Sequence, residues 1–372
     1  MAKHKYNDLQ KKYNGYMAPT CTVVINKSDK LSKEEPSLIK SAEVELTAGY
    51  EASACHIVIN KGITVDVAKN DIVFNQAIKD LVKLGQPISV SLGYLDEQQA
   101  VFQGIITNIQ LEYEADTGIE MHIEGMDVKC LMMNNYHSCQ PRKDLKKYSD
   151  AFKEVVKKYA KLISKQTIAD TDEMVLAIEQ HNQSDYEFLV SIARKCNHAF
   201  YINNGELLFE PYGKDSSPCI ELDIQELQQF RREISLSNQI AEVTVRANNE
   251  TDPNKSFEFT AKTFKAIGKG KKGSIDLMSS LKEMAKMTIV DPSISSAKEA
   301  KARAEAELFK HSMKFSQGSF QTVGIPEIIP AKLMTIKGFG NDYNNDYYIK
   351  KVTHIMNEEG YITKGELGVN KV

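Results

Sequence analysis

The stretch VFQGIITNIQLEYEADTGIEMHIEG, residues 101–125, has the pattern of two strands around a polar turn, because β-branched and apolar residues alternate with polar ones on either side of Ala-Asp-Thr-Gly. The stretch YYIKKVTHIMNEEGYITKGELG, residues 347–368, has the same pattern. We align Ile-Ile-Thr-Asn-Ile at 105–109 with Lys-Val-Thr-His-Ile at 351–355. The two stretches therefore predict one strand hairpin that occurs twice in the chain.

The segments that precede the two hairpins are also alike. GQPISVSLGY at 85–94 and GIPEIIPAKLMTIKGFG at 324–340 both contain Gly-x-Pro, a predicted strand and a glycine followed by an aromatic residue. An amphipathic helix is predicted shortly before each Gly-x-Pro. This repeated order indicates two copies of one β-barrel. Spacing alone also leaves open a chance similarity between two short β-segments.

The first predicted barrel extends over residues 20–130. TCTVVINK, AEVELTAGY and CHIVIN are short segments rich in β-branched residues and separated by polar turns, which indicates strands. NDIVFNQAIKDLVKLG at 70–85 has helical periodicity, with an apolar face formed by Ile72, Val73, Ala77, Ile78, Leu81 and Val82. We therefore expect a barrel that carries one helix.

A separate α+β module is predicted after this barrel. SDAFKEVVKKYAKLIS at 149–164 has the periodicity of an amphipathic helix. In SDYEFLVSIARKCNHAFYINNGELLFEP at 184–211, Ser184 and Glu187 have the spacing of a capping box, which predicts a helix that begins here. Asn204-Gly205 then lies between two apolar segments, which indicates a tight hairpin.

Cys196 and His198 in this module are the candidate nucleophile and base. Cys196 belongs to the apolar stripe near the C-terminal end of the predicted helix, where the helix dipole opposes a thiolate. His198 is only two residues away, so the two side chains would point apart on a helix. We interpret the pair as packing residues and expect neither a catalytic residue nor an enzymatic activity.

The composition excludes several classes of function. The chain has 372 residues, 26% of them charged, with a net charge of −3, which gives no global attraction to nucleic acids or membranes. No apolar run reaches membrane-spanning length and the N-terminus does not resemble a signal peptide, so we expect synthesis in the cytosol. His137-x-Cys139 lacks a second ligand pair, so no metal and no cofactor are expected. We expect reduced core thiols at the six cysteines, Cys21, Cys55, Cys130, Cys139, Cys196 and Cys219.

GKGKKG at 268–273 matches a dinucleotide-binding pattern, but its surroundings do not. The preceding SFEFTAKTFKAI alternates like a half-exposed strand, and no β-α-β alternation follows. We interpret the basic segment Lys262–Lys272 as a flexible, exposed loop that is dispensable for folding. PSISSAKEAKARAEAELFKHSM at 292–313 predicts a helix with a Ser or Asp cap.

Three stretches together resemble the hubs of contractile-tail baseplates: the late control D proteins of contractile phages, the hubs of R-type bacteriocins and the N-terminal part of type VI secretion VgrG. Residues 180–211 resemble the family's Gln-x-x-x-Ser/Thr-Asp-x-x-Phe-Leu helix with its hairpin. Residues 85–109 resemble the first tube barrel and residues 347–370 the end of the second. The resemblance covers nearly the whole chain.

The resemblance implies an α+β, mainly β fold with two tube-type β-barrels, each with a helix. We expect the first barrel at 1–140, the α+β module at 141–228, and the second barrel with the inserted basic loop and helix at 229–372. Three chains would form a ring of six barrels that joins a sixfold tail tube to a threefold spike. The candidate residues for the ring and tube interface are Gly93, Tyr94, Phe102, Gly104, Gly338, Phe339, Tyr348, Gly360 and Tyr361.

The implied partners are further copies of the chain, the tail tube protein, the central spike, and the tape measure and baseplate wedge proteins, with no membrane and no specific nucleic acid. The implied location is the cytoplasm during assembly and then the tail particle. The sequence stops at Val372 after the second barrel, without an OB-fold, a β-helical spike or a lysozyme domain, which fits a phage or bacteriocin hub better than VgrG. The alternatives are a tail tube or other tail structural protein and, with less support, a cysteine hydrolase.

Overall fold

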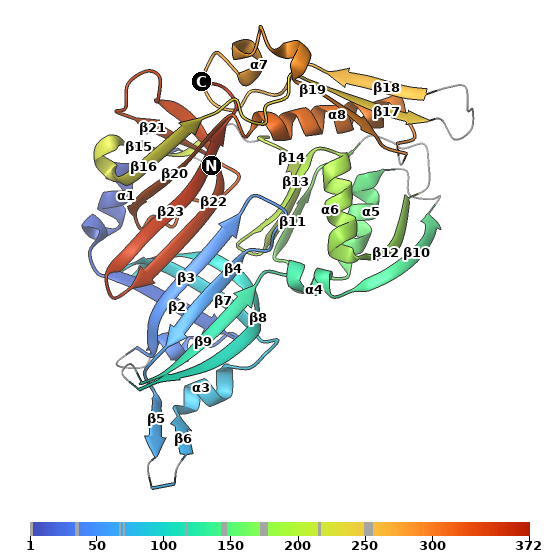
Figure 1. Ribbon diagram of the computed structural model, residues 1–372. Coiled ribbons are helices and arrows are strands. Elements are labelled where there is room, and N and C mark those ends of the chain that lie inside the picture. Colours follow the sequence, from blue (N-terminus) through green and yellow to red (C-terminus); the bar gives the residue numbers. More distant parts are fainter. Residues whose placement is uncertain are drawn as a thin grey trace.

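A computed structural model describes residues 3–33, 37–66, 68–69, 71–115, 118–142, 147–171, 178–214, 217–248, 256–292 and 294–372, without the side chains of 139–142 and 248. The fold is mainly β and is built on one large sheet (Figure 1). Its path is β1-β15-β21-β22-β3-β4-β9-β8-β7-β2, and β16, β20 and β23 continue from β22. The strands are β1 His4–Lys5, β2 Pro19–Ile25, β3 Ile39–Thr47, β4 Ala54–Ile59, β7 Pro87–Tyr94, β8 Glu97–Glu114, β9 Gly118–Met126, β15 Pro218–Asp223, β16 Leu227–Ile234, β20 Ser316–Val323, β21 Leu333–Lys337, β22 Asn345–Asn357 and β23 Gly360–Val369.

Strand β22 joins the N-terminal and C-terminal halves of the sheet. Residues 345–348 pair with β21, whereas Lys351 to Met356 pair with β3, so two strands share one edge of β22. β23 covers the other edge. A single hydrophobic core contains side chains of both halves, including Val44 and Val352, which are fully buried. The two halves are therefore one packing unit.

The two halves contain the same order of six strands. The order is β2-β7-β8-β9-β4-β3 in the N-terminal half and β15-β21-β22-β23-β20-β16 in the C-terminal half. The outer strand differs, since β2 is antiparallel to β7 whereas β15 is parallel to β21. The shared order extends the similarity that the sequence shows only for the last three strands.

Two β-bulges define how the halves correspond, residue by residue. β8 is bulged at Thr107 against β9, and β22 is bulged at Lys350 against β23. The hairpins close seven residues later in both cases, at the pairs Glu114–Gly118 and Asn357–Gly360. Residues 105–109 therefore correspond to 348–352, and the predicted alignment with 351–355 was wrong by three residues. Alternating strand sequences resemble one another at several offsets, so similarity alone did not locate the bulge.

The helices before the two Gly-x-Pro segments exist but are not equivalent. α3 (Gln76–Leu81) leads directly to Gly85, whereas β20 separates α8 (Ala297–Ser312) from Gly324. α3 is also shorter than predicted, because Ile72 and Val73 lie in the hairpin of β5 (Ile63–Asp66) and β6 (Asp71–Phe74). Asn75 caps the helix with its side chain, which accepts a hydrogen bond from the Ala77 amide. Asn75 therefore marks the boundary between strand β6 and helix α3.

The α+β module has a core of its own. It contains α4 (Lys129–Met133), β10 (Tyr136–Arg142), α5 (Tyr148–Lys157), β11 (Lys165–Ile168), β12 (Ile178–Ser184), α6 (Asp185–Lys195), β13 (His198–Asn203) and β14 (Glu206–Pro211). The predicted helix and hairpin of 184–211 are confirmed, including the capping box of Ser184 and Glu187. Phe152, Leu189 and Phe200 are fully buried in this core.

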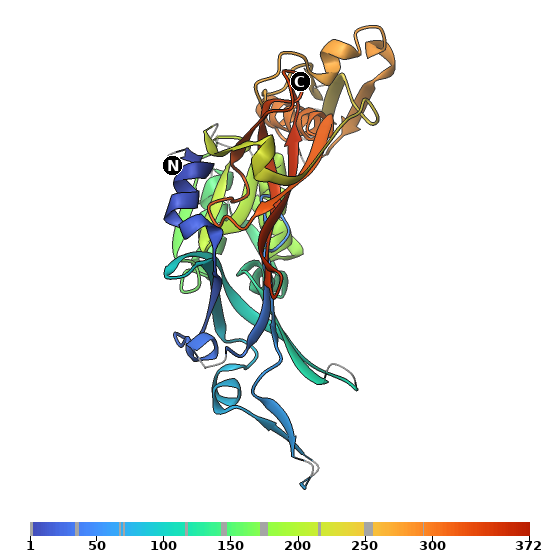
Figure 2. The same ribbon diagram turned by 90° about the vertical axis from the view of Figure 1, so that its left-hand side faces the viewer.

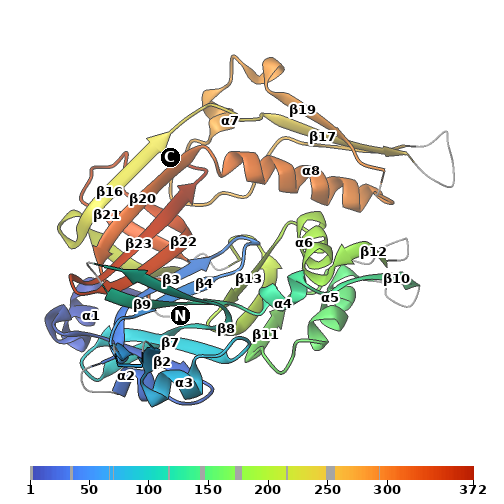
Figure 3. The same cartoon turned by 60° about the horizontal axis from the view of Figure 1, so that its bottom comes forward.

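A third unit lies beyond the C-terminal half (Figure 3). Its sheet has the order β18-β17-β19, formed by β17 (Glu242–Asn248), β18 (Ser256–Ala261) and β19 (Lys286–Val290). α8, capped by Ser296 as predicted, covers one face of this sheet through Ala300, Ala304 and Leu308. The remaining helical segments of the chain are α1 (Tyr6–Lys12), η1 (Asn14–Tyr16), α2 (Lys30–Lys33), η2 (Ile224–Glu226), α7 (Ser274–Leu277) and η3 (Lys282–Met284).

The basic segment Lys262–Lys272 is packed rather than flexible, which corrects the prediction. Its lysine side chains are exposed, but its backbone is held by the C-terminal end of the chain. The Ile267 amide donates to Oδ1 of Asn370 at 2.7 Å, and Lys272 exchanges two backbone hydrogen bonds with Val372. The Ile267 side chain is buried in the main core. Composition did not predict these contacts because the partner is about a hundred residues away.

Candidate assembly surfaces

The large sheet has a polar face that continues through both halves. From β16 to β2 all neighbouring strands are antiparallel, so register rows can be followed from half to half. One row contains Gln229, Gln321, Lys364, Thr353 and Glu45. A salt bridge of 2.7 Å joins Lys351 of β22 to Glu45 of β3 on this face. The neighbouring row, which includes Phe320 and Val352, is buried.

Two histidines stack on the polar face of the N-terminal half. Nε2 of His56 lies 3.1 Å from Nδ1 of His122, and the rings are nearly parallel. His122 is 3.2 Å from Glu112 of β8, and Glu120 forms a salt bridge with Lys40. No group of three possible metal ligands occurs in the part of the chain that the structure describes. The pair therefore belongs to a network of charged surface groups.

Two hairpins extend the N-terminal half beyond its core. Figure 2 shows that the hairpin of β5 and β6 and the hairpin of β8 and β9 project from the body. β8 is 18 residues long, and β7 pairs with it only as far as Ile105. The outer part of β8 therefore pairs with β9 alone among the described residues. This arm is a strong candidate for an assembly contact.

The structure separates the nine predicted interface residues into two groups. Tyr94, Phe102, Tyr348 and Tyr361 are buried within the single chain. Gly93 is also buried, whereas Gly104, Phe339 and Gly360 are partly exposed and Gly338 is exposed. The sequence did not separate these groups, because the candidates came from the Gly-x-Pro strands and the two hairpins as whole segments, without an assignment of each residue to a face of the sheet. An interface role stays a prediction for all nine.

Tyr94 and Tyr361 bring the two Gly-x-Pro segments together inside the core. Their ring centroids are 5.7 Å apart, and the Tyr94 hydroxyl donates to the Gly324 carbonyl at 2.9 Å. A Cβ atom on Gly324 would lie 2.1 Å from the Tyr361 ring, so only glycine allows this approach. Gly85 instead has a φ of 78° and open space around it. The two glycines therefore have different structural roles.

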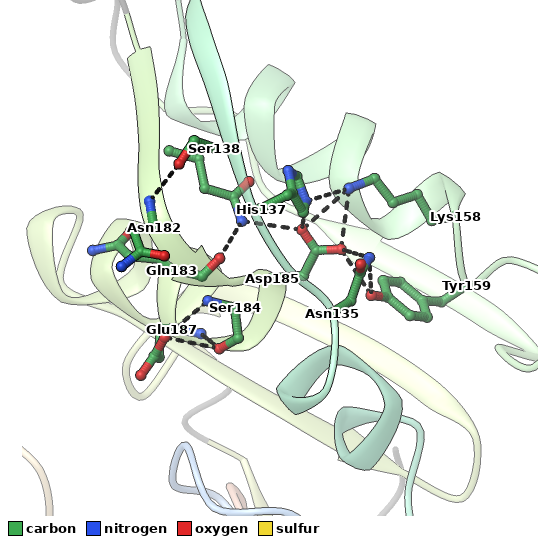
Figure 4. A network of polar contacts seen from close by, with 11 residues as sticks. Asn135, His137, Ser138, Lys158, Tyr159, Asn182, Gln183, Ser184, Asp185 and Glu187 are labelled. Carbon is green, nitrogen blue, oxygen red and sulfur yellow. Dashed lines mark hydrogen bonds and ion pairs between the residues drawn. The ribbon is translucent and has the colours of Figure 1, made fainter.

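A polar network around Asp185 explains the motif at the start of α6 (Figure 4). Asp185 is fully buried as the first residue of the helix. Its carboxylate accepts hydrogen bonds from Tyr159 at 2.7 Å and Asn135 at 2.8 Å, and an ion pair joins it to Lys158. Nε2 of His137 lies 2.7 Å away and donates to the same carboxylate. Five side chains thus converge on one acid, since Gln180 also donates to it at 3.2 Å.

The network makes Asp185 a stable anion. Burial alone raises the pKa of Asp185, but hydrogen bonds from Tyr159, Lys158, His137 and Gln180 outweigh it and lower the pKa. Gln180 also donates to the Gln183 carbonyl, which fixes the turn into the helix. The Gln-x-x-x-Ser-Asp spacing is therefore a structural device that anchors α6 to β10, β12 and α5. His137 of the predicted His137-x-Cys139 pair contacts Asp185, and the Cys139 side chain lies outside the described residues.

Lys129 fixes the module to the first half of the sheet. It is fully buried, and its Nζ atom donates to the backbone carbonyls of Tyr50, Glu51 and Phe200 at 3.1, 2.8 and 3.3 Å. Burial lowers the pKa of Lys129 to about 8. Burial also raises the pKa of Asp127, which accepts hydrogen bonds from the Ser53 and Lys129 amides. Sequence patterns gave no signal for this buried lysine.

In the Cys196–His198 pair the imidazole is directed at the backbone of Cys196. Nδ1 of His198 donates to the backbone carbonyl of Cys196 at 2.7 Å, and burial lowers the pKa of the imidazole. Cys196 is the C-cap of α6 and packs partly against the module's core. This geometry agrees with a packing role.

A cleft of about 750 Å³ lies where the sheet, the module and α8 meet. Its lining includes the aromatic residues Tyr212, Phe309 and Tyr348 and the charged residues Arg194 and Lys310. Sequence reasoning missed this cleft, because its walls come from three units that are distant in the chain.

No helix in the described ranges has the length and hydrophobicity that crossing a membrane requires.

The fold is that of phage tail proteins, which confirms the predicted resemblance at the level of fold. A tail protein from Neisseria meningitidis has a TM-score of 0.67 at 11% identity, covering 94% of this chain and 96% of that chain. A 43 kDa tail protein of a Shewanella oneidensis prophage has a TM-score of 0.68 at 12% identity, covering 94% and 98%. A prophage tail protein from Listeria monocytogenes has a TM-score of 0.52 at 8% identity, covering 95% of each chain.

The family is shown by a sequence model. The model described as Alg8 N-terminal domain matches residues 38–358, and the chain belongs to this family. No curated protein sequence matches the chain.

Proposed function

We propose that this protein is the structural hub of a contractile injection tail, a homotrimer that joins a sixfold tail tube to a threefold central spike. The single observation that supports this proposal most is the repeated order of six strands within one chain. Three chains with two such halves provide six similar positions, which is what an adaptor between sixfold and threefold symmetry requires. The fold shared with phage tail proteins supports a tail structural role.

The proposed division of the chain is a first tube-like barrel at 1–140, a module at 141–228 and a second barrel at 229–372. The separate core of the module supports a division between it and the sheet, since Phe152 and Phe209 pack there and not in the main core. That core also contains Val128 and Met132, which precede residue 141, and β15, which precedes residue 229, pairs within the large sheet. The shared core of the two halves indicates that the barrels fold together. Lys129, close to the first boundary, is buried against carbonyl groups of both the first half and the module.

The proposed partners are two further copies of the chain, the tail tube, the spike, and the tape measure and baseplate wedge proteins. The proposed location is the cytoplasm during assembly and then the tail particle. A tail tube protein is the second candidate, but one strand set per subunit is enough for a hexameric tube, whereas this chain has two. A cysteine hydrolase lacks support, because His198 donates to the Cys196 carbonyl.

The mass of the assembly tests the proposal. Light scattering should be measured on the full chain alone and after co-expression with the spike protein of its particle, because a hub can require the spike to trimerise. Three copies of the chain in either sample support the hub. A hexamer would instead favour the tail tube, and a monomer in both samples would contradict both assignments.

A further inference from the structure

Among the strand edges that lack a strand partner in the described residues, two belong to β8 and β16, and both strands are part of the repeated strand order. Beyond Ile106, the outer edge of β8 has no strand partner within the described ranges. β16 pairs with β20 on one side, and its second edge is likewise open in the described part of the sheet. Open strand edges invite pairing with another chain unless something covers them.

The equivalent part of the C-terminal half shows what covers such an edge. The bulges equate Ile109, Leu111 and Tyr113 of β8 with Val352, His354 and Met356 of β22. β3 covers the edge of β22, and Val352 and His354 have no exposed surface. Leu111 and Tyr113 are 44% and 69% exposed, although they lie on the same face of the equivalent strand. β8 therefore lacks the partner that β22 has.

The same correspondence identifies β16 as the counterpart of β3. β3 has an irregular register against β4 between Ile39 and Ser41, and β16 has one against β20 between Leu227 and Gln229. Residues 41–46 of β3 then correspond to 229–234 of β16. β3 is paired on both edges, whereas β16 is paired on one. β16 thus repeats β3, and the outer edge of β8 repeats the edge of β22 that β3 covers. Within the chain only β3 and β22 pair with each other.

We infer that β16 of one copy pairs in antiparallel register with the outer part of β8 of the next copy, as β3 pairs with β22 within the chain. This inference rests on the homotrimer of the proposed function and specifies its interface. Transfer of the β3–β22 register gives the neighbouring pairs Ile109–Ile234, Gln110–Glu233, Leu111–Arg232, Glu112–Arg231 and Tyr113–Phe230.

The side chains of this register are complementary. Ile234 is 45% exposed and would cover Ile109, and Phe230 would meet the exposed Tyr113. Arg231 has a highly exposed side chain and would lie opposite Glu112, while Arg232 extends over the tyrosines at 343 and 347. Opposite charges and apolar pairs that face each other across strands stabilise a sheet.

The charges also favour β16 over β3 as the strand that pairs with β8. At the position of Arg231 in β16, β3 has Glu43, and at the position of Glu112 in β8, β22 has Ile355. A second copy of β3 on β8 would place Glu43 opposite Glu112, which is repulsive. The interface is head-to-tail, since β8 and β16 are different surfaces, and such a contact forms a closed ring when the rotation between copies is one third of a turn. A closed ring leaves neither edge open.

A pair of cysteines tests the register. Gln110→Cys combined with Glu233→Cys places one thiol on each proposed edge, at the separation of directly opposed Cα atoms, which suits a disulfide. The matched positive control is Glu45→Cys with Thr353→Cys, the equivalent pair within the chain. Gln110→Cys with Gln229→Cys is the negative control, because four residues along the strand separate the thiols by about 13 Å. The unsubstituted chain controls for the native cysteines.

The chain should be oxidised alone and in complex with the spike protein, and then denatured without reductant. We expect covalent dimers and trimers from the first pair, an intrachain disulfide from the positive control, and neither from the negative control. Disulfide-linked dimers from Gln110→Cys alone would show that β8 pairs with itself and would overturn the inference. A trimer by light scattering without the cross-link overturns the register but leaves the hub intact, whereas a monomer overturns both.

Charge reversal gives an independent test. Glu112→Arg or Arg231→Glu should each weaken the trimer, and the double substitution should restore it, because the pair is then reversed. Both side chains are exposed, so the monomer should fold in every variant. Trimer dissociation measured for the four proteins by light scattering at low salt decides the outcome. Equal trimer stability in all four contradicts the pairing of Glu112 with Arg231.

Discussion

The hydroxyl group of Tyr13 donates a hydrogen bond of 2.7 Å to Oε1 of Glu327, which lies 314 residues further along the chain. Lys12 and Gln99 donate to the same oxygen at 2.9 and 2.8 Å. The N-terminal segment, the start of β8 and the segment that leads to β21 therefore meet at one buried carboxylate. The ring of Tyr13 is fully buried against Tyr94, so the N-terminal segment is part of the core of both halves.

Tyr13→Phe should lower the free energy of unfolding by about 1 to 2 kcal/mol, because the substitution removes one donor from a buried carboxylate and keeps the ring. Tyr13→Ala should cost about 3 to 5 kcal/mol, since it also leaves a cavity. Urea denaturation measures both values. Tyr136→Phe is the matched control on an exposed tyrosine and should have little effect. Equal stability of Tyr13→Phe and the unsubstituted protein would show that the N-terminal segment does not contribute through this bond.

Asp185→Ala should destabilise the module by about 3 kcal/mol or more, because it leaves Lys158, Tyr159 and Asn135 without their shared acceptor. Asp170→Ala, which removes an exposed partner of Lys153, is the control and should have little effect. The lowered pKa of Asp185 adds a pH dependence. Its stabilising contribution is present above the unfolded pKa and is lost as the pH falls through the folded pKa. Loss of this acid sensitivity in Asp185→Asn would confirm the assignment, and its persistence would contradict it.

Lys129 predicts a pH dependence of the same sign as Asp185, but in the alkaline range. The folded chain releases the Lys129 proton near pH 8, whereas the unfolded chain keeps it until about pH 10.5. Between these values the unfolded state binds more protons, so the contribution of this group to stability rises with pH. The unsubstituted protein should therefore gain stability relative to Lys129→Met between about pH 7.5 and about pH 9.5. Lys271→Met, at an exposed lysine, should show no such difference in urea denaturation.

Replacement of Ala266–Gly273 by a short Gly-Ser linker should lower the melting temperature by several degrees. The replacement removes the buried Ile267 side chain and the backbone bonds to Asn370 and Val372. Lys271→Ala with Lys272→Ala keeps these backbone bonds and is the control, with an unchanged melting temperature. If the linker variant melts at the same temperature as the intact chain, the packing of this segment contributes nothing to stability.

Local signals in the sequence were sufficient for the module's helix and hairpin. The capping box of Ser184, the apolar stripe of α6 and the Asn204-Gly205 turn act over a few residues, and all three are confirmed. The sequence also predicted that a strand hairpin preceded by a Gly-x-Pro strand occurs twice, and β7–β9 and β21–β23 are these strands. Its offset was wrong by three residues, because a bulge leaves no mark in an alternating pattern.

Contacts between distant segments account for what sequence reasoning missed. The packing of 262–272 depends on Asn370, and the burial of Lys129 depends on carbonyl groups from two units. The predicted interface residues Tyr94 and Tyr361 lie in the core with ring centroids 5.7 Å apart, and the sequence did not predict this contact between distant segments. The open edges of β8 and β16 become visible only when the two halves are compared strand by strand.

The most direct test of the proposed hub is native mass spectrometry of the full chain, alone and co-expressed with the spike protein of its particle. We expect a complex that contains three copies of the 41.8 kDa chain in at least one of the two samples. The two halves of each chain then supply six tube-facing positions. Detection of only single chains in both samples, or of six-chain rings, would contradict the trimeric adaptor.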